Sequence, residues 1–224
     1  MSQTDRWIFA SVVLVIAIFP WVVSNIGAIS HYVEVMIFAG IFSLVCLGLS
    51  LLMGYAGQIS LAQAAFFGIG AYSSGILSAH FGWNPWLAMP VGAALSATVA
   101  WIVGIPALRL KGHYLAMATL GFGVIVHIVF NEEIDLTGGP SGMVDIPGLS
   151  IAGWRITSEM QWYYLVWGVV FLALLFCFHV LRSRVGRALR GIHEDEVAAE
   201  SMGVPTARLK VQIFVFGAVM AAIA

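Results

Sequence analysis

The residues best suited to ionic contacts lie together between positions 182 and 210. An acidic run, Glu194-Asp195-Glu196, sits among basic residues, which are Arg182, Arg184, Arg187, Arg190, Arg208 and Lys210. Apolar residues recur between these charges at helical spacing, which predicts two short amphipathic helices. Such helices can dock on a partner protein, or they can lie against lipid headgroups. The residues by themselves leave both interpretations open.

The ends of these two helices are also predicted by residue type. One apolar face is formed by Val185, Leu189 and Ile192, and a second by Val197, Ala198 and Met202. The acidic run suits the start of the second helix, where the helix dipole favours negative charge. Gly203 suits the position just past its end. Thr206 is expected to cap the long apolar helix that follows.

A second polar cluster lies just before and within an apolar segment, and its members are Tyr55, Gln58, Ser60 and Gln63. Polar groups without partners are costly in lipid, so these side chains are expected to face protein or water. Gly54 and Gly57 predict an irregular backbone in the same place. We take the four residues as candidates for a translocation path. Hydrogen bonding between helices is the alternative that the pattern leaves open.

Other chemistries find little support in the sequence. The histidines lack metal-ligand spacing, so no metal site is expected, and Cys46 and Cys177 lie inside apolar runs. There is no phosphate-binding GxxxxGK[ST] loop. Few ionisable residues lie within the apolar segments, which counts against proton- or sodium-coupled transport. We therefore expect no catalytic residue, no cofactor and no nucleic acid partner.

Composition defines the elements that must position these residues. The 224 residues are 61% hydrophobic and 9% charged, with a mean hydropathy of +0.97. Apolar residues come in runs close to the ~20 that a membrane helix requires, without the alternation of a barrel. Seven such segments are predicted: about 7–23, 33–53, 61–79, 86–108, 113–130, 162–181, and one beginning near 211. The expected fold is an all-α, polytopic transmembrane bundle in a single domain, 1–224.

The distribution of charge predicts the topology. Basic residues outside the 182–210 loop lie before the first segment and between the fourth and fifth, apart from Arg155, which stands alone in the acidic 131–161 loop. A cytoplasmic N-terminus then places every basic cluster inside, loop 182–210 in the cytoplasm and loop 131–161 in the periplasm. The first segment is expected to stay as a membrane helix. The last segment reaches Ala224 before it can cross the bilayer, so we expect the sequence to be a fragment.

The fourth segment has a small residue at every fourth position: Ala88, Gly92, Ser96, Ala100 and Gly104. Such a stripe allows two membrane helices to approach closely. We therefore predict a packed helix interface along this face. The sequence Thr137-Gly-Gly-Pro-Ser-Gly142, in the acidic loop, predicts consecutive turns.

Several blocks resemble the M-type (LivM-like) permeases of ABC importers for branched-chain amino acids. Val197-Ala-Ala-Glu-Ser-Met-Gly203 with Ile213 resembles the EAA loop of ABC permeases, although Val197 replaces its first Glu and Val215-Phe216 its Leu-Pro. Further blocks, in the family's order, are 54–63, 64–72, 106–116, 119–123, 136–142 and 187–200. Urea and amide importers share these motifs, so the solute is less certain than the family.

The resemblance implies a subunit that works in a complex in the bacterial inner membrane. Expected partners are a related permease in a heterodimer, two ATP-binding subunits that hydrolyse ATP, a periplasmic solute-binding protein and membrane lipid. The ATPase-coupling residues would be Arg187, Arg190, Glu194, Glu196, Ala198, Ala199 and Gly203. Two other interpretations remain: a stand-alone channel or facilitator for a small neutral solute, and a membrane scaffold subunit that transports nothing itself.

Overall fold

The computed structural model describes residues 16, 18–20, 31–144, 146–151 and 154–224. The predicted first membrane segment, 7–23, falls almost wholly outside these residues. The elements of the bundle are α2 (His31–Ser50), the π-helix η2 (Leu51–Tyr55), α3 (Gln63–Ala79), α4 (Pro85–Ala107), α5 (His113–Glu132), α7 (Glu159–Arg182) and α10 (Thr206–Ile223). The connecting elements are α6 (Ile134–Thr137), the 3₁₀ helix η3 (Gly139–Ser141), β1 (Ser150–Ile151), β2 (Trp154–Arg155), α8 (Arg184–Glu194) and α9 (Glu196–Ser201).

Within the described ranges, five helices are long and apolar enough to cross a membrane: Tyr32–Tyr55, Pro85–Ala107, His113–Glu132, Glu159–Arg182 and Thr206–Ile223. The helix α3, with 17 residues, is shorter than these five. At 1.5 Å per residue it extends about 26 Å, a little less than a hydrocarbon core. The all-α architecture is confirmed, with a two-residue antiparallel hairpin as a small addition between α6 and α7.

Three predicted boundaries differ in the structure, and a side-chain cap explains one of them. The helix α7 begins at Glu159 because Ser158 and Gln161 form a capping box there, and α5 continues to Glu132. The predicted 131–161 loop is therefore shorter at both ends. The last helix begins at Thr206 rather than near 211, so Thr206 is its first residue and not its N-cap. Pro205 precedes it with no capping side chain, since proline fits the edge of a helix without losing a bond.

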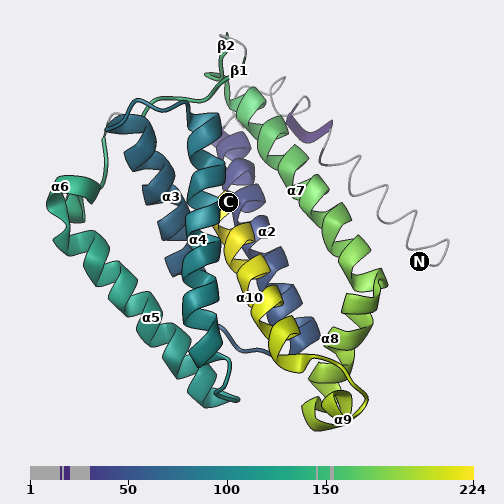
Figure 1. Ribbon diagram of the computed structural model, residues 1–224. Coiled ribbons are helices and arrows are strands. Elements are labelled where there is room, and N and C mark those ends of the chain that lie inside the picture. The colour runs from purple at the N-terminus through teal and green to yellow at the C-terminus, as the bar shows by residue number, and fades with distance from the viewer. Residues whose placement is uncertain (1–15, 17, 21–30, 145, 152–153) are drawn as a thin grey trace.

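The helix α10 lies in the middle of the bundle (Figure 1), packed against α4, α3 and α2. On one side of this centre, α7 packs along α2. On the other side, α5 stands at the outside of the bundle, with only 11% of its membrane window buried against 50% for α10. The short helices α8 and α9 lie at the lower end of the bundle in Figure 1, and the hairpin β1–β2 lies at the upper end.

The predicted stripe of small residues forms the contact between α4 and its neighbours. All five of its residues are buried. A Cβ placed on Gly92 would lie 3.0 Å from the carbonyl oxygen of Gly70 in α3, and one on Gly104 would lie 3.1 Å from Phe214 in α10. Ser96 Oγ donates a hydrogen bond to the carbonyl of Ala218 in α10 at 3.3 Å. The small residues therefore let backbones meet directly, and the predicted interface is confirmed.

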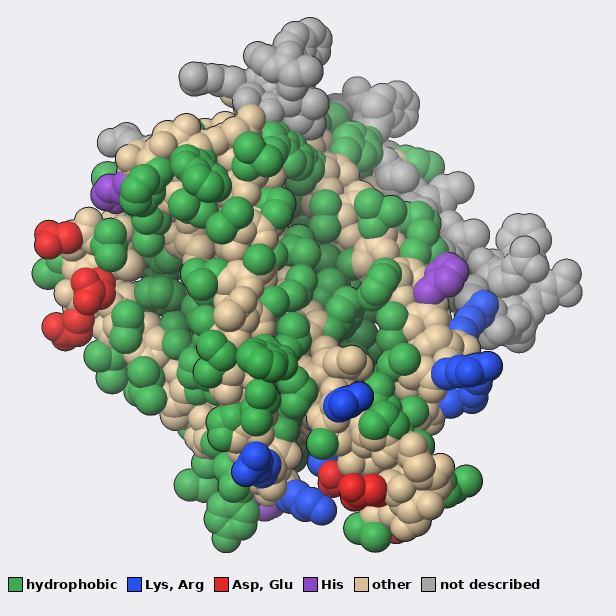
Figure 2. Space-filling model, in the orientation of Figure 1, with side chains coloured by type: hydrophobic (Ala, Val, Ile, Leu, Met, Phe, Trp, Pro, Cys, Tyr) green, Lys and Arg blue, Asp and Glu red, His purple; other side chains and the backbone are tan. Residues whose placement is uncertain are grey.

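Charge gathers at the ends of the bundle. Figure 2 shows apolar side chains over the middle of the molecule, with Lys and Arg gathered toward its lower end, where α8 and α9 lie. Acidic side chains form a separate group at the left of this view, beside the upper end of α5 and near α6. The predicted turns at 137–142 are also present, as α6, a left-handed Gly138 with φ of 77° and the helix η3. The site candidates lie at the basic end.

Candidate functional site

The helix α8 is fixed to the end of α7 by a cap and by two arginines. Ser183 is its N-cap, and its hydroxyl accepts a hydrogen bond from a backbone N–H of the first turn at 3.1 Å. Arg190 Nη2 donates to the carbonyl of Leu181 at 3.0 Å. Arg187 Nη1 reaches the next carbonyl, that of Arg182, at 3.5 Å. Both exposed guanidinium groups thus satisfy carbonyls that the end of a helix leaves without partners.

The helix α9 is short, and both of its ends are capped. The Asp195 carboxylate accepts hydrogen bonds from Val197 N at 2.9 Å and Ala198 N at 3.0 Å. Asp195 is therefore the N-cap that separates the two helices, and Glu194 belongs to the end of α8. At the other end, Gly203 has φ of 82°, a conformation that glycine adopts without the penalty of a side chain. The predicted helix pair and its stop at Gly203 are confirmed.

Exposure differs sharply between the two faces of this helix pair. Leu189, Ile192 and Ala199 point inward and are almost fully buried. Val197 is 66% exposed and Met202 is 85% exposed. Two large apolar side chains in that position leave an apolar surface at the tip of α9, next to the exposed Ala198.

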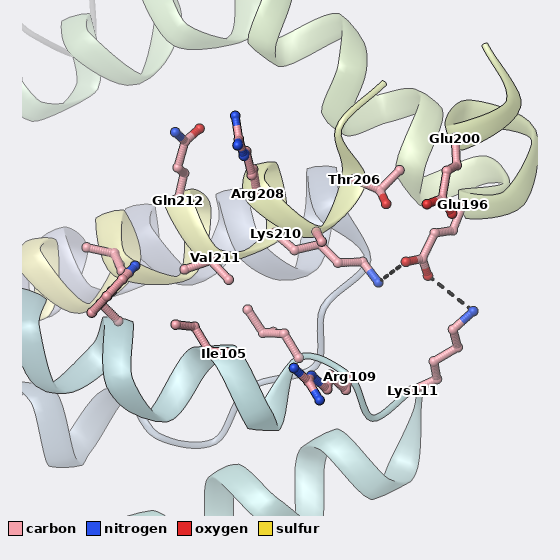
Figure 3. Close-up of a pocket in the computed structure, with 14 residues that line it drawn as sticks. Ile105, Arg109, Lys111, Glu196, Glu200, Thr206, Arg208, Lys210, Val211 and Gln212 are labelled. Carbon is pink, nitrogen blue, oxygen red and sulfur yellow. Dashed lines mark hydrogen bonds and ion pairs between the residues drawn. The ribbon is translucent and has the colours of Figure 1, made fainter. Parts of the chain in front are cut away.

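Glu196, the first residue of α9, points inward to an ionic cluster (Figure 3). Its Oε1 accepts a hydrogen bond from Lys210 Nζ of α10 at 2.5 Å, and its Oε2 lies 3.4 Å from Lys111 Nζ in the α4–α5 turn. Lys210 is only 11% exposed, whereas Lys111 is 71% exposed. The contact with Lys210 is thus the stronger half of the cluster, because solvent screens exposed pairs.

The cluster also sets the protonation of Glu196. Burial raises the pKa of this carboxyl, but the hydrogen bonds and charges of Lys210 and Lys111 lower it by more, so the pKa lies below its usual value. Glu196 therefore carries a full negative charge at neutral pH, which the buried ammonium group of Lys210 requires.

The backbone is irregular where the path candidates lie. The end of the first described span is a π-helix that contains Tyr55, and Gly57 follows with φ of 64°. The helix α3 resumes only at Gln63. Leu61 N, in the irregular stretch, donates to Thr119 Oγ1 of α5 at 3.0 Å. The irregularity that Gly54 and Gly57 predict is confirmed, and its polar side chains Gln58 and Ser60 are buried although Gly57 and Leu61 are exposed.

Three of the four path candidates are buried: Gln58, Ser60 and Gln63. Ser60 Oγ accepts a hydrogen bond from Ala62 N at 3.4 Å, and Tyr55 packs against the apolar core. In the part of the chain that the structure describes, neither side-chain polar atom of Gln58 or of Gln63 has a hydrogen-bond partner. Buried amides of this kind are costly and unusual.

A cavity of about 130 Å³ brings the two groups of candidates together. Gln58 of the irregular stretch and Glu196 of α9 both line it, as do Lys111 and Lys210. His193 of α8 lines it too, and its Nδ1 would lie 2.7 Å from a Cβ placed on Gly57. The end of α8 thus packs against the irregular backbone with no room for a side chain at Gly57.

The structure does not place all candidates at one point. Gln63 faces away from this cavity, and its Nε2 would lie 3.3 Å from a Cβ placed on Gly217 in α10. Lys111, Lys210 and His193 also belong to the site, although sequence patterns assigned none of them a role and marked Lys210 only as one of the basic residues of the 182–210 loop. The one sequence signal for Lys210 is a charge at the start of an apolar helix. Nothing local predicts that Glu196 is its partner.

A groove of about 710 Å³ runs beside the cavity on the outer side of the ionic cluster. Apolar residues of α4 and α10 line it, with charged residues from α9 and the α4–α5 turn at one end (Figure 3). Among the described residues, no group of three or more His, Cys, Asp or Glu side chains could hold a metal ion. The arrangement suits the docking of another chain and the passage of a polar solute.

A bundle of apolar helices, five of them long enough to cross a membrane, with a capped amphipathic helix pair at its basic end defines a multi-pass membrane protein. Residues 31–224 match the family described as "Branched-chain amino acid transport system / permease component". The chain belongs to this family, which confirms the resemblance drawn from its motifs.

The relatives that it matches are permease subunits. It is 32% identical over 247 aligned residues to the high-affinity branched-chain amino acid transport system permease protein LivM of Salmonella typhimurium, and 31% identical to that of Escherichia coli. These alignments cover 100% of this chain but 57% of each relative. The LivH permease of Escherichia coli is 30% identical over 199 residues, 82% of this chain and 64% of LivH. No solved structure matches the chain significantly.

Proposed function

We propose that the chain is part of a membrane-spanning permease subunit of an ATP-driven importer. The solute would be a branched-chain amino acid or a similar small polar molecule, in keeping with the names of its LivM and LivH relatives. Urea or an amide is the alternative solute class, since importers of these compounds share the motifs.

The observation that carries this proposal is the α8–α9 helix pair. It stands at the lower end of the bundle in Figure 1, toward which Figure 2 shows Lys and Arg gathered. Caps at both ends of α9 hold its backbone, while Val197 and Met202 are turned out to the surface. A stand-alone facilitator has no use for an ordered helix with exposed apolar side chains, whereas an ATPase needs a surface to push on.

The proposed complex contains this subunit and a related permease as a heterodimer, two ATP-binding subunits and a periplasmic solute-binding protein. ATP would be hydrolysed on the separate subunits, not on this chain. The subunit would lie in the bacterial inner membrane, in contact with lipid, with its N-terminus and the α8–α9 end in the cytoplasm. The segment that contains α6 and the β hairpin would then face the periplasm.

Two groups of residues have roles in this proposal. The ATPase-coupling residues would be Arg187, Arg190, Glu194, Glu196, Ala198, Ala199 and Gly203. The arginines and Glu196 would shape and hold the helix pair, and the exposed residues of α9 would meet the ATPase. The solute would pass Tyr55, Gln58, Ser60 and Gln63 as the helices rock between outward- and inward-open states.

Substitution of Gly203 tests the coupling role, and Gly142 offers a matched control. Both glycines have positive φ, of 82° and 71°, and a Cβ on either would meet nothing within 4 Å. Alanine strains the backbone at both positions, which lie at opposite ends of the bundle, and it does so more at Gly142, whose ψ of 176° completes a conformation that is almost restricted to glycine. We expect Gly203→Ala and the bulkier Gly203→Leu to uncouple ATP hydrolysis from uptake, and Gly142→Ala to leave both coupled.

The measurement is solute uptake and ATP hydrolysis by the full protein, copurified with its partners in mild detergent and reconstituted. Wild-type coupling in Gly203→Leu would contradict the coupling role. A preparation that takes up solute with no ATPase present would favour a facilitator. A docked ATPase without any solute flux through this subunit would favour a scaffold.

A further inference from the structure

The ionic cluster of Lys111, Glu196 and Lys210 occupies a boundary between two spaces. All three residues line the inner cavity of about 130 Å³, and all three also line the outer groove of about 710 Å³. The inner cavity reaches the buried Gln58, whereas Gln58 does not line the groove. The cluster is therefore part of the wall that separates Gln58 from the groove.

We propose that this cluster is an ionic gate at the coupling end of the permease, which opens when α9 moves. The inference rests on the proposed function and deepens it, because it gives Glu196 a role inside the chain. Glu196 would be a positioning residue that closes the wall, and it would not itself be a contact to the ATPase.

The geometry of Glu196 supports a movable link. Its two carboxylate oxygens bond to two different elements, α10 through Lys210 and the α4–α5 turn through Lys111 (Figure 3). Glu196 is itself the first residue of α9, a helix of only six residues. A shift of α9 by the length of one ion pair would therefore withdraw the carboxylate from both lysines at once.

The cluster has open volume on both sides. Ala199, on the buried face of α9, packs in the apolar core, so a movement of α9 that frees Glu196 also shifts this contact. Lys210 is 11% exposed, and a buried ammonium group without a counter-ion is strongly unfavourable. When Glu196 leaves, Lys210 and Lys111 would thus attract water or the negative end of a passing solute into the gap.

The same movement would reach the irregular backbone. His193, at the end of α8, lies against Gly57, next to Gln58. Helices α8 and α9 are joined only at Asp195. A push on the helix pair would thus act on both walls of the inner cavity, on the irregular stretch through His193 and on α10 through Glu196.

Access to the inner cavity can be measured directly. Leu115 of α5 is 5% exposed and lines the inner cavity but not the groove. We would introduce Leu115→Cys into the full protein with Cys46 and Cys177 replaced by alanine, and measure its reaction with a small water-soluble thiol reagent in native membranes. We expect Glu196→Gln to speed labelling about tenfold or more, the factor that matches loss of a hydrogen bond to a charged group.

Glu200→Gln is the matched control for this variant. Glu200 is an exposed acid of the same helix that lines the groove but not the inner cavity, so its variant is expected to label at the wild-type rate. Glu196→Lys combined with Lys210→Glu keeps both charges and is expected to return labelling close to the wild-type rate, which Glu196→Lys alone is not.

Unchanged labelling in Glu196→Gln, with the protein intact in the membrane, would overturn the gate. The gate would also be overturned if the double variant were labelled as fast as Glu196→Lys alone. This second comparison decides the matter if Glu196→Gln fails to accumulate. The assay needs neither ATP nor a partner chain. Its failure is therefore distinct from failure of the importer proposal, which is decided by copurification and coupled uptake.

Discussion

Two parts of the molecule are held together differently. The small-residue core, formed where α3, α4 and α10 meet, brings backbones into direct contact. A Cβ on Gly70 would overlap the backbone of Ala222, and one on Gly92 would lie 3.0 Å from the carbonyl oxygen of Gly70. The α8–α9 helix pair buries one apolar face in the core and is otherwise held by caps, arginine contacts and the ion pairs of Glu196. The small-residue core has no room to adjust, whereas the polar contacts of the helix pair can break and form again.

This difference indicates which helices of a permease would move as one body and which would change their contacts. Dispersion contacts between close-packed backbones are lost steeply with small displacements, so helices α3, α4 and α10 should move as one body. Ion pairs and caps each contribute little, and they act over longer distances with adjustable side chains. Movement imposed at the basic end would therefore change the contacts of α8 and α9 first and reach the bundle as a rigid displacement.

The largest effect is expected from adding volume to the core. Gly70→Val would force α3 away from the backbone of Ala222 in α10, and overpacking of this kind costs about 1–3 kcal/mol or more. We expect a strong loss of thermal stability and of monodisperse yield in mild detergent. Gly121→Val is the control, since a Cβ on Gly121 of α5 would meet nothing within 4 Å. Equal stability of the two variants would show that the core is not rigid.

A smaller effect is expected from Gln58→Leu, at the border between the two regions. This change should lower transport without lowering stability. Gln58→Leu removes a buried amide whose polar atoms have no partner among the described residues. Such unsatisfied groups cost about 1–3 kcal/mol, so thermal stability should stay equal or rise. Uptake should be lost while the complex still assembles, if Gln58 lines the path.

Both outcomes for Gln58→Leu can fail separately. Normal uptake in a stable variant would remove Gln58 from the path and leave hydrogen bonding between helices as its role. A clear drop in thermal stability would mean that the amide has partners in the folded complex, such as water in the inner cavity. The melting temperature of the purified protein and uptake by the reconstituted complex distinguish these cases.

The sequence predicts the long helices of the bundle well, because each of them corresponds to a local pattern of residue types. Long apolar runs predict the membrane helices, the repeat from Ala88 to Gly104 predicts the packed face of α4, and Gly203 predicts the end of α9. The start of α7 moved because of the capping box at Ser158, which hydropathy does not show. The start of α10 moved without a capping side chain, since a polar start with Arg208 and Lys210 precedes its apolar run.

The site was predictable only in its parts. Charges between 182 and 210 were evident as candidates, but sequence spacing gives no reason for Glu196 to turn toward Lys210 and Lys111 and not outward. That choice depends on α10 and the α4–α5 turn meeting beneath α9, which is a property of the tertiary fold. The shared cavity of Gln58 and Glu196 has the same origin, since their positions are far apart in the chain.

The smallest effect is expected from removing one cap in each region. Asp195→Ala removes the carboxylate that accepts from Val197 N and Ala198 N, and Asn84→Ala removes the side chain that accepts from Trp86 N at 3.0 Å at the start of α4. Each loss costs about 1 kcal/mol.

A six-residue helix is marginal alone, so Asp195→Ala should unfold α9 for much of the time, whereas α4 is supported by its packing. Hydrogen exchange at 196–203 should rise only in Asp195→Ala, together with a loss of ATP-driven uptake. Equal exchange in the two variants would mean that α9 is held by its ion pairs, and that the helix pair is as firmly fixed as the core.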